Sequence, residues 1–135
     1  MKNRSLTKDY VTRAGIRFAA LQVLLDKGGY ADVVREAQEI VELLSKSLIR
    51  HLGAEPARVH DVSAQLRELR SRLQPELHSK LDALITHSRE LRRDRELAFY
   101  GTEDLTPSEF YSKEDAERAF GYASESLAFV QGLVS

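Results

Sequence analysis

The sequence of 135 residues contains no cysteine and no tryptophan, and it has only three prolines. Without cysteine there are no disulfides, thiolate metal sites or cysteine nucleophiles, which agrees with a cytoplasmic location. No apolar run is long enough to span a bilayer, and the polar N-terminus does not resemble a secretory signal, so no membrane association is expected. The net charge of −1 provides no overall attraction for nucleic acid. Any binding of RNA or nucleotide therefore depends on a local cluster of positive charge.

Apolar residues recur at spacings of three and four along most of the chain, and no useful stretch alternates with a period of two. This pattern predicts an all-α protein, and the length fits a single domain spanning residues 1–135. Prolines and glycines fall mostly between the periodic segments, which predicts an antiparallel up-and-down bundle of about five helices. The expected helices span residues 6–26, 30–52, 59–73, 75–98 and 113–134, with Gly53 after the second helix and Ser112 capping the last.

The first expected helix has apolar residues on two sides. One side carries a core-like stripe, formed by Tyr10, Ala14, Phe18, Leu21 and Leu25. Ile16 and Val23 lie on the opposite side. A helix that is apolar on two sides usually has two partners, so we expect this helix to contact both the core and another subunit.

Four arginines gather near the end of the expected fourth helix, namely Arg89, Arg92, Arg93 and Arg95. At 100° per residue, Arg95 lies on the same side as the apolar Leu77, whereas Arg93 points nearly the opposite way. A guanidinium within an apolar stripe needs a partner or must reach water. Two interpretations stay open: structural arginines that interact with the helix C-terminus, or a site that binds an anion or phosphate.

The other polar residues give weaker signals. The four histidines lack the spacing of a metal site, and no phosphate-binding loop or nucleotide fingerprint is present, so no cofactor is expected. For His60, which precedes Asp61, we expect capping and local hydrogen bonding rather than catalysis. Glu42 and Lys46 are four residues apart, and this spacing predicts a surface ion pair.

Residues 100–111 are expected to form a loop. The aromatic residues in and beside this loop either pack on the bundle or stack with bases, namely Phe99, Tyr100, Phe110 and Tyr111.

Three segments resemble one known family. In the first, Tyr30 follows a glycine, residues 37–42 read A-Q-E-I-V-E, and Lys46 lies four residues after Glu42. In the second, Gly53 is followed by H-D-V at residues 60–62. The third spans residues 93–119 and contains R-E-L-A-F-Y-G, P-S-E-F-Y-S and E-D-A-E-R-A. In this order on an all-helical chain, the segments resemble the HEPN domain family over about residues 5–134.

The resemblance implies an antiparallel helical bundle that commonly forms a homodimer. Many members of the family are encoded beside a minimal nucleotidyltransferase, with which they form a complex or a toxin–antitoxin pair. Active members are RNases that need no metal and carry R-x4-6-H near the end of the penultimate long helix, often followed by a tyrosine. In such pairs the nucleotidyltransferase can silence the RNase by transferring AMP to that tyrosine.

The catalytic histidine of this motif is missing here. Arg93 and Tyr100 match the arginine and the tyrosine, but Ala98 stands at the histidine position, and Arg95 is an equally good counterpart of the arginine. The resemblance therefore assigns nucleotide or RNA binding to four residues, namely Arg92, Arg93, Arg95 and Tyr100, with Arg93, Arg95 and Tyr100 as candidate catalytic residues and Tyr100 as the candidate for modification. His60 could replace the missing histidine only if the fold brings it to this region.

Three functional hypotheses follow. The first is a homodimeric binding module that partners a nucleotidyltransferase and binds nucleotide or RNA at an arginine-rich cleft. The second is a divergent RNase toxin, for which the loss of a proton-transferring histidine predicts weak or no activity at the usual site. The third is a helical scaffold whose arginines are structural.

Overall fold

The computed structural model describes residues 2–100 and 106–134, with side chains described for residues 4–93 and 106–134. The described residues contain helices and no β-strand, which confirms the predicted all-α class. The helices are α1 (Lys2–Asp26), α2 (Tyr30–His51), α3 (Ser63–Glu68), η1 (Arg70–Arg72), η2 (Pro75–Leu77), α4 (His78–Tyr100), α5 (Pro107–Phe110) and α6 (Lys113–Val134). None of the described helices combines the length and the apolar content needed to cross a membrane.

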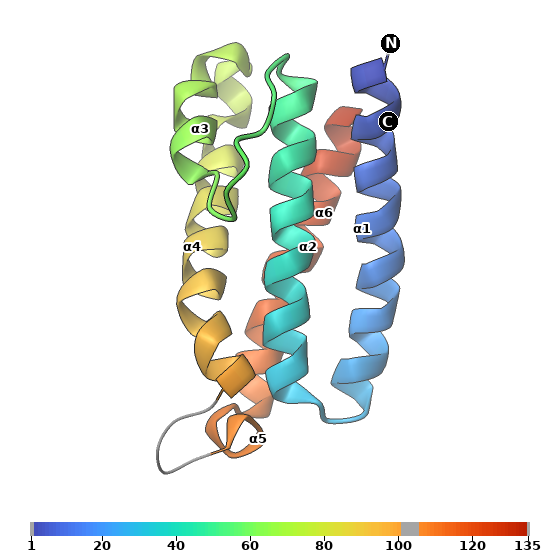
Figure 1. Ribbon diagram of the computed structural model, residues 1–135, viewed down its shortest axis with the longest axis vertical. Coiled ribbons are helices and arrows are strands. Elements are labelled where there is room, and N and C mark those ends of the chain that lie inside the picture. The colour runs from blue at the N-terminus through green and yellow to red at the C-terminus, as the bar shows by residue number, and fades with distance from the viewer. Residues whose placement is uncertain (1, 101–105, 135) are drawn as a thin grey trace.

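The four long helices form an up-and-down bundle. In Figure 1, α1 descends, α2 ascends, α4 descends and α6 ascends, so that both termini lie at the same end. The helix α2 packs against α1, α4 and α6 and is therefore the central element. The short α3 stands beside the upper part of α4, and α5 lies at the opposite end of the bundle (Figure 1).

The core follows the apolar stripe of α2. Ile40, Leu44 and Leu48 on this helix are fully buried, as are Leu21 of α1 and Leu81 of α4. Burial of each such side chain stabilises the fold by about 1.5–3 kcal/mol relative to exposure. The opposite edge of α2 carries polar residues with the same helical spacing, and these form the candidate site.

Two glycines with positive φ connect α2 to its neighbours. Gly28 has φ +79° and ends α1, and Gly53 has φ +88° and follows the last turn of α2. This left-handed backbone is strained for residues with a Cβ. The predicted place of Gly53 after the second helix is confirmed.

The prediction of a helix over residues 59–73 is wrong about where the helix begins, because α3 starts at Ser63. The chain stays non-helical through Val62, α3 ends at Glu68, and a turn of 3-10 helix follows. Val59, which was expected to contribute to the apolar stripe, is 52% exposed. The connection is held by the Gln65 amide, whose Oε1 accepts from Ala57 N at 2.8 Å and whose Nε2 donates to Glu55 O at 2.6 Å. These side-chain bonds compete with helix formation, and they keep His60 outside α3.

Smaller differences concern helix ends. The expected fourth helix begins with a 3-10 turn over Pro75–Leu77 before α4 starts at His78. Within the expected loop over residues 100–111, Pro107–Phe110 forms the short helix α5, whose N-terminus is capped by the Thr106 hydroxyl accepting from Glu109 N at 3.3 Å.

Candidate functional site

A single carboxylate, that of Glu42, lies at the centre of the candidate site. Gln38, Glu42 and Lys46 are spaced by four residues and therefore share one face of α2. Gln38 Nε2 donates to Glu42 Oε1 at 3.2 Å, and Lys46 Nζ contacts Glu42 Oε2 at 3.2 Å. The predicted Glu42–Lys46 ion pair is thus confirmed. It is not an isolated surface pair, because the Glu42 side chain is only 16% exposed.

The connection between α2 and α3 brings His60 to this carboxylate. His60 Nδ1 lies 3.2 Å from Glu42 Oε2 and 3.3 Å from Oε1, although the two residues are 18 positions apart. Because an ionised carboxylate only accepts hydrogen bonds, Nδ1 carries a hydrogen in this contact and the lone pair of the neutral ring is on Nε2. His60 does not cap α3. The backbone N–H of Ser63 donates instead to Asp61 Oδ1 at 3.0 Å.

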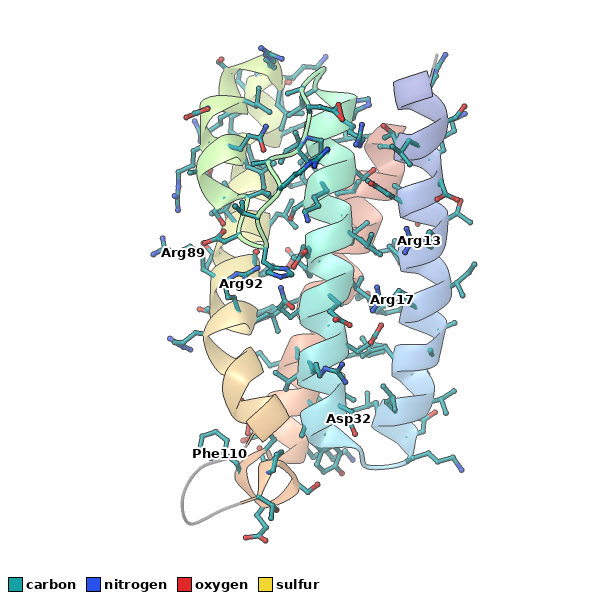
Figure 2. The ribbon with its side chains drawn as sticks, in the orientation of Figure 1. Arg13, Arg17, Asp32, Arg89, Arg92 and Phe110 are labelled. Carbon is teal, nitrogen blue, oxygen red and sulfur yellow. The ribbon has the colours of Figure 1, made fainter. Side chains whose placement is uncertain are left out.

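One of the predicted arginines reaches the same carboxylate. Arg92 Nη2 of α4 lies 3.5 Å from Glu42 Oε1, and the Arg92 side chain is 28% exposed. Charge-assisted hydrogen bonds are usually 2.7–2.9 Å long, so this long contact leaves donors of the guanidinium available for another acceptor. Figure 2 shows Arg92 on the side of α4 that faces α2, whereas Arg89 projects outward from the same helix.

The charges of the site stabilise its carboxylates. Burial alone would raise the pKa of Glu42, but hydrogen bonds from Gln38, His60 and Lys46, together with the charge of Lys46, outweigh burial and lower this pKa. Hydrogen bonding from Ser63 lowers the pKa of Asp61, and the charges of Arg92 and Arg89 lower it further. Both carboxylates are therefore ionised at neutral pH. Lys46, Arg89 and Arg92 provide three positive charges against these two negative ones, before His60 is counted.

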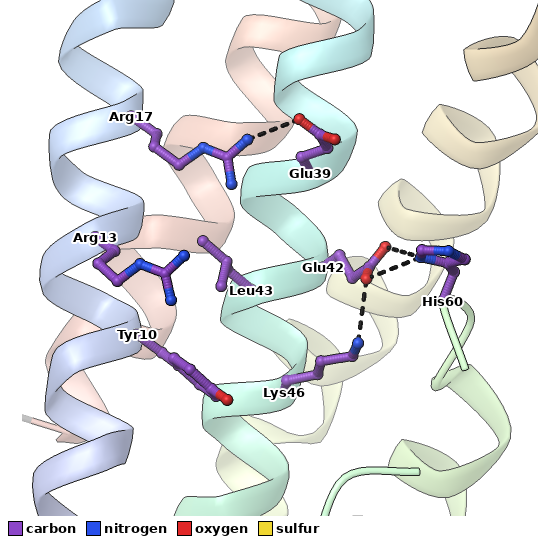
Figure 3. A pocket seen from close by; sticks show the side chains of 8 residues that line it. All are labelled: Tyr10, Arg13, Arg17, Glu39, Glu42, Leu43, Lys46 and His60. Atoms are coloured by element: carbon purple, nitrogen blue, oxygen red, sulfur yellow. Dashed lines mark hydrogen bonds and ion pairs between the residues drawn. The ribbon is translucent and has the colours of Figure 1, made fainter. Parts of the chain in front are cut away.

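A pocket of about 240 Å³ opens beside Glu42, between α1 and α2, and His60, Lys46, Tyr10 and Arg13 line it. Figure 3 shows the side chains of Tyr10 and Arg13 extending from α1 toward α2. The Arg13 guanidinium lies 6.0 Å from the centre of the Tyr10 ring, and no acidic partner for Arg13 is found among the described residues. In the same pocket Arg17 is neutralised, because Nε and Nη2 each lie 2.7 Å from a carboxylate, that of Glu36 and that of Glu39 respectively.

The other predicted site residues are not all brought together. Arg93 is exposed and lines a separate hollow of about 350 Å³ with Thr86, Arg89 and Glu90. It also lines a small pocket with Tyr111 and Arg118, and neither hollow includes Glu42, Lys46 or His60, so Arg93 lies apart from the contact between Arg92 and Glu42. The side chains of Arg95 and Tyr100 lie outside the described residues.

A second histidine–carboxylate pair lies between α4 and α6. His87 Nε2 is 2.7 Å from Glu125 Oε2, and the His87 ring stacks on Tyr122 with 4.0 Å between ring centres. The Tyr122 hydroxyl in turn donates to Glu90 at 2.6 Å. His87 is 15% exposed, and its Nδ1 is buried without a hydrogen-bond partner. The free nitrogen of His87 faces the interior, so this pair is poorly suited to act on a ligand.

The fold and the site define an all-α bundle in which Lys46, His60 and Arg92 gather around a carboxylate of the central helix. The family model described as HEPN domain matches residues 7–133, and the chain belongs to this family. No curated protein and no solved structure matches the chain in the corresponding searches. The resemblance inferred from the sequence is thus confirmed over nearly the whole chain.

Sequence reasoning identified Arg92 but not the residues around it. The sequence predicts Glu42 and Lys46 as an ion pair and as part of the family motif. It predicts His60 as a residue of local structure, with a role as the replacement histidine only if the fold brings it to the arginine-rich region. Their convergence depends on contacts between residues 18 and 50 positions apart. The H-D-V segment after Gly53 was the one available signal, because it places a histidine shortly after the central helix.

Proposed function

We propose that this HEPN-domain protein is a cytoplasmic binding module that engages the phosphates of a nucleotide or RNA at the cluster around Glu42. The carrying observation is the convergence of Arg92, Lys46 and His60 on one carboxylate, while the charge of Arg89 acts on the neighbouring Asp61. Positive charge in excess of nearby carboxylates attracts phosphate, and arginine is well suited to bind it. Arg93 and Arg95 extend the cationic end of α4 in this proposal.

The proposed partner is a minimal nucleotidyltransferase, in a toxin–antitoxin pair of the kind that members of this family form. Tyr100 is the proposed site of modification by that partner. Co-expression with a neighbouring nucleotidyltransferase would test both points. We expect the two proteins to co-purify and the intact mass of the HEPN chain to rise by one AMP, with no such rise in the Tyr100→Phe variant. Absence of both the complex and the mass change would contradict this part of the proposal.

We also propose that two copies of the chain associate through the outer face of α1. Ile16 is 67% exposed and Val23 is 54% exposed in the single chain. Together with the exposed Ala19 and Ala20 they form one stripe along the helix. In an antiparallel pair of α1 helices centred between the two alanines, Ile16 lies opposite Val23 of the other copy. Such a pairing covers the apolar face that the bundle leaves open.

Phosphate binding is tested by titrating the protein into fluorescent single-stranded RNA at several salt concentrations. For the Arg89→Gln/Arg92→Gln variant, we expect weaker binding and a salt slope reduced by about 0.7 for each lost phosphate contact. The Lys27→Gln/Arg67→Gln variant loses the same charge at exposed positions elsewhere and should bind like the parent. If neither RNA nor a nucleotide binds at low salt, a scaffold with structural arginines is the better description.

A further inference from the structure

A groove between α4 and α6 lies apart from the site around Glu42. Both helices pack closely on α2 but touch each other little, and a cavity of about 370 Å³ lies between them. Its lining comes from residues 77–87 of α4 and 125–133 of α6, and none of these residues lines the pocket beside Glu42. Pockets that hold small molecules usually measure about 300–1,000 Å³, so this groove is large enough for a ligand.

The inner side of the groove is apolar, and the groove is long and narrow. Leu84 and Phe129, which line it, are 1% and 9% exposed. At 1.5 Å per residue, the lining segments are about 12–15 Å long, so the volume corresponds to a channel about 5 Å across. An α-helix with its side chains is about 10–12 Å in diameter and does not fit such a channel. An unbranched alkyl chain does.

Two side-chain hydrogen bonds join α4 to α6 and close one end of the groove. His87 Nε2 lies 2.7 Å from Glu125 Oε2, and the Tyr122 hydroxyl donates to Glu90 Oε2 at 2.6 Å. The carboxylates at this end are thus already engaged, and the His87 ring faces its own stacking partner. The apolar end of a ligand therefore lies toward His87, and its polar end lies toward the start of α4.

The other end of the groove holds a positive charge that lacks a counter-ion. Lys80 is exposed and lines the groove, and among the described residues no carboxylate lies within ion-pair distance of it. The neighbouring Asp82 is bound by Arg70, whose Nη2 lies 2.8 Å from Oδ2. Lys80 is in the first turn of α4, where the helix dipole disfavours a cation and where no acidic residue offsets it. Both the lysine and the dipole therefore favour an anion at this end.

We propose that the groove between α4 and α6 binds an unbranched fatty acid of medium chain length, with its carboxylate at Lys80 Nζ and its alkyl chain between Leu84 and Phe129. Each methylene group removed from water strengthens binding by about fourfold. An exposed ion pair such as that with Lys80 adds only about two- to fivefold. The alkyl chain thus supplies most of the affinity, and Lys80 selects the charged group. This site is separate from the proposed phosphate-binding cluster, and neither depends on the other.

The test is isothermal titration calorimetry of the full chain with decanoate, octanoate and 1-octanol, each below the concentration at which it forms micelles. Octanoate has two methylene groups fewer than decanoate and should bind about 15-fold more weakly. Lys80→Met keeps an apolar side chain of similar length without the charge. It should weaken the binding of octanoate by about two- to fivefold and leave the binding of 1-octanol unchanged. Equal effects of Lys80→Met on the two ligands would overturn the assignment of the carboxylate to Lys80.

Gly132 allows the groove to be filled without a clash. It is exposed and lines the groove, and a Cβ added there would meet no atom within 4 Å. Gly132→Leu should therefore fold and should abolish the binding of decanoate. Gly121→Leu is the matched control, because this exposed glycine of the same helix has equally free space and lies outside the groove, so the variant should bind like the parent.

Two further variants keep the result interpretable. Ala128→Leu is a second replacement at an exposed position that lines the groove, and circular dichroism of each variant shows whether the fold persists. Ile16→Lys/Val23→Lys removes the exposed apolar residues of α1 and should leave decanoate binding unchanged, which excludes adsorption to that face. Absence of decanoate binding by the parent, or equal binding by the parent and the two folded groove-filling variants, would overturn the proposal.

Discussion

At the scale of single residues, the ionisation of Glu42 makes the stability of the fold depend on pH. Its pKa is lowered in the folded chain, so ionised Glu42 stabilises the fold above the ordinary carboxyl pKa of about 4.5, and this contribution disappears as the pH falls through the lower folded value. At neutral pH, Glu42→Gln should lower the free energy of unfolding by about 1 kcal/mol, because it weakens charge-assisted bonds and leaves Lys46 and Arg92 without their carboxylate.

Urea unfolding at pH 7 and at pH 3 measures this difference. We expect the difference in the free energy of unfolding between the parent and Glu42→Gln to be smaller at the lower pH, because the stability that ionised Glu42 contributes shrinks once the pH falls below about 4.5, its pKa in the unfolded chain. Glu68→Gln is a matched control at an exposed position and should match the parent at both pH values. A gap of constant size would show that ionisation of Glu42 contributes nothing to stability.

The residue scale is also where the sequence was least informative about the site. Helical spacing placed Glu42 beside Lys46, because that contact is local. The contacts of Glu42 with His60 and Arg92 bridge separate elements and depend on how α4 and the α2–α3 connection pack on α2. No local pattern encodes that packing. The same limit explains why helical spacing separates the adjacent Arg92 and Arg93 by 100° but does not say which of them faces α2.

At the scale of elements, the long helices were predictable because apolar periodicity and caps act locally. The connection between α2 and α3 was not predictable in this way. Gln65 satisfies backbone groups of the connection with its own side chain, and the periodic residue Val59 consequently remains exposed. The resulting non-helical path lets His60 reach α2. The failed helix prediction and the missed site residue therefore have the same physical origin.

The start of α6 shows how a predicted cap acts on an element. Ser112 Oγ accepts from Asp115 N at 3.3 Å, and Asp115 Oδ2 accepts from Ser112 N at 2.9 Å. This reciprocal pair confirms the predicted cap and lowers the pKa of Asp115, chiefly through the backbone bond from Ser112. Ser112→Ala should destabilise the protein by about 1 kcal/mol, measured by urea unfolding at pH 7. Ser124→Ala, at an exposed position within the same helix, should have little effect, and equal losses for both variants would contradict the capping role.

At the scale of the whole molecule, the bundle separates two kinds of surface. The face crossed by α2 and the α2–α3 connection carries the charged cluster (Figure 3), whereas the outer side of α1 carries the exposed apolar stripe. Arg13, three residues before Ile16, borders the stripe. The cluster of Lys46, His60 and Arg92 lies on α2, on α4 and on the α2–α3 connection, away from the outer side of α1, so association through the stripe leaves this cluster open. Dimerisation and phosphate binding are therefore expected to be independent, and a variant that loses one should retain the other.

This independence gives a test of assembly by light scattering after size-exclusion chromatography. The parent should have twice the 15.3 kDa mass of one chain. Ile16→Lys/Val23→Lys should shift the protein to the monomer, because each charged side chain would have to be buried against its counterpart in the pair. The fold should persist, since both positions are more than half exposed. Ala64→Lys/Ser71→Lys adds the same charge at exposed positions around α3 and should remain dimeric.

A monomeric parent, or a dimer that survives both α1 substitutions, would show that this face of α1 does not join two copies of the chain. RNA binding by Ile16→Lys/Val23→Lys should equal RNA binding by Ala64→Lys/Ser71→Lys, because both variants carry two added lysines and only the first is monomeric.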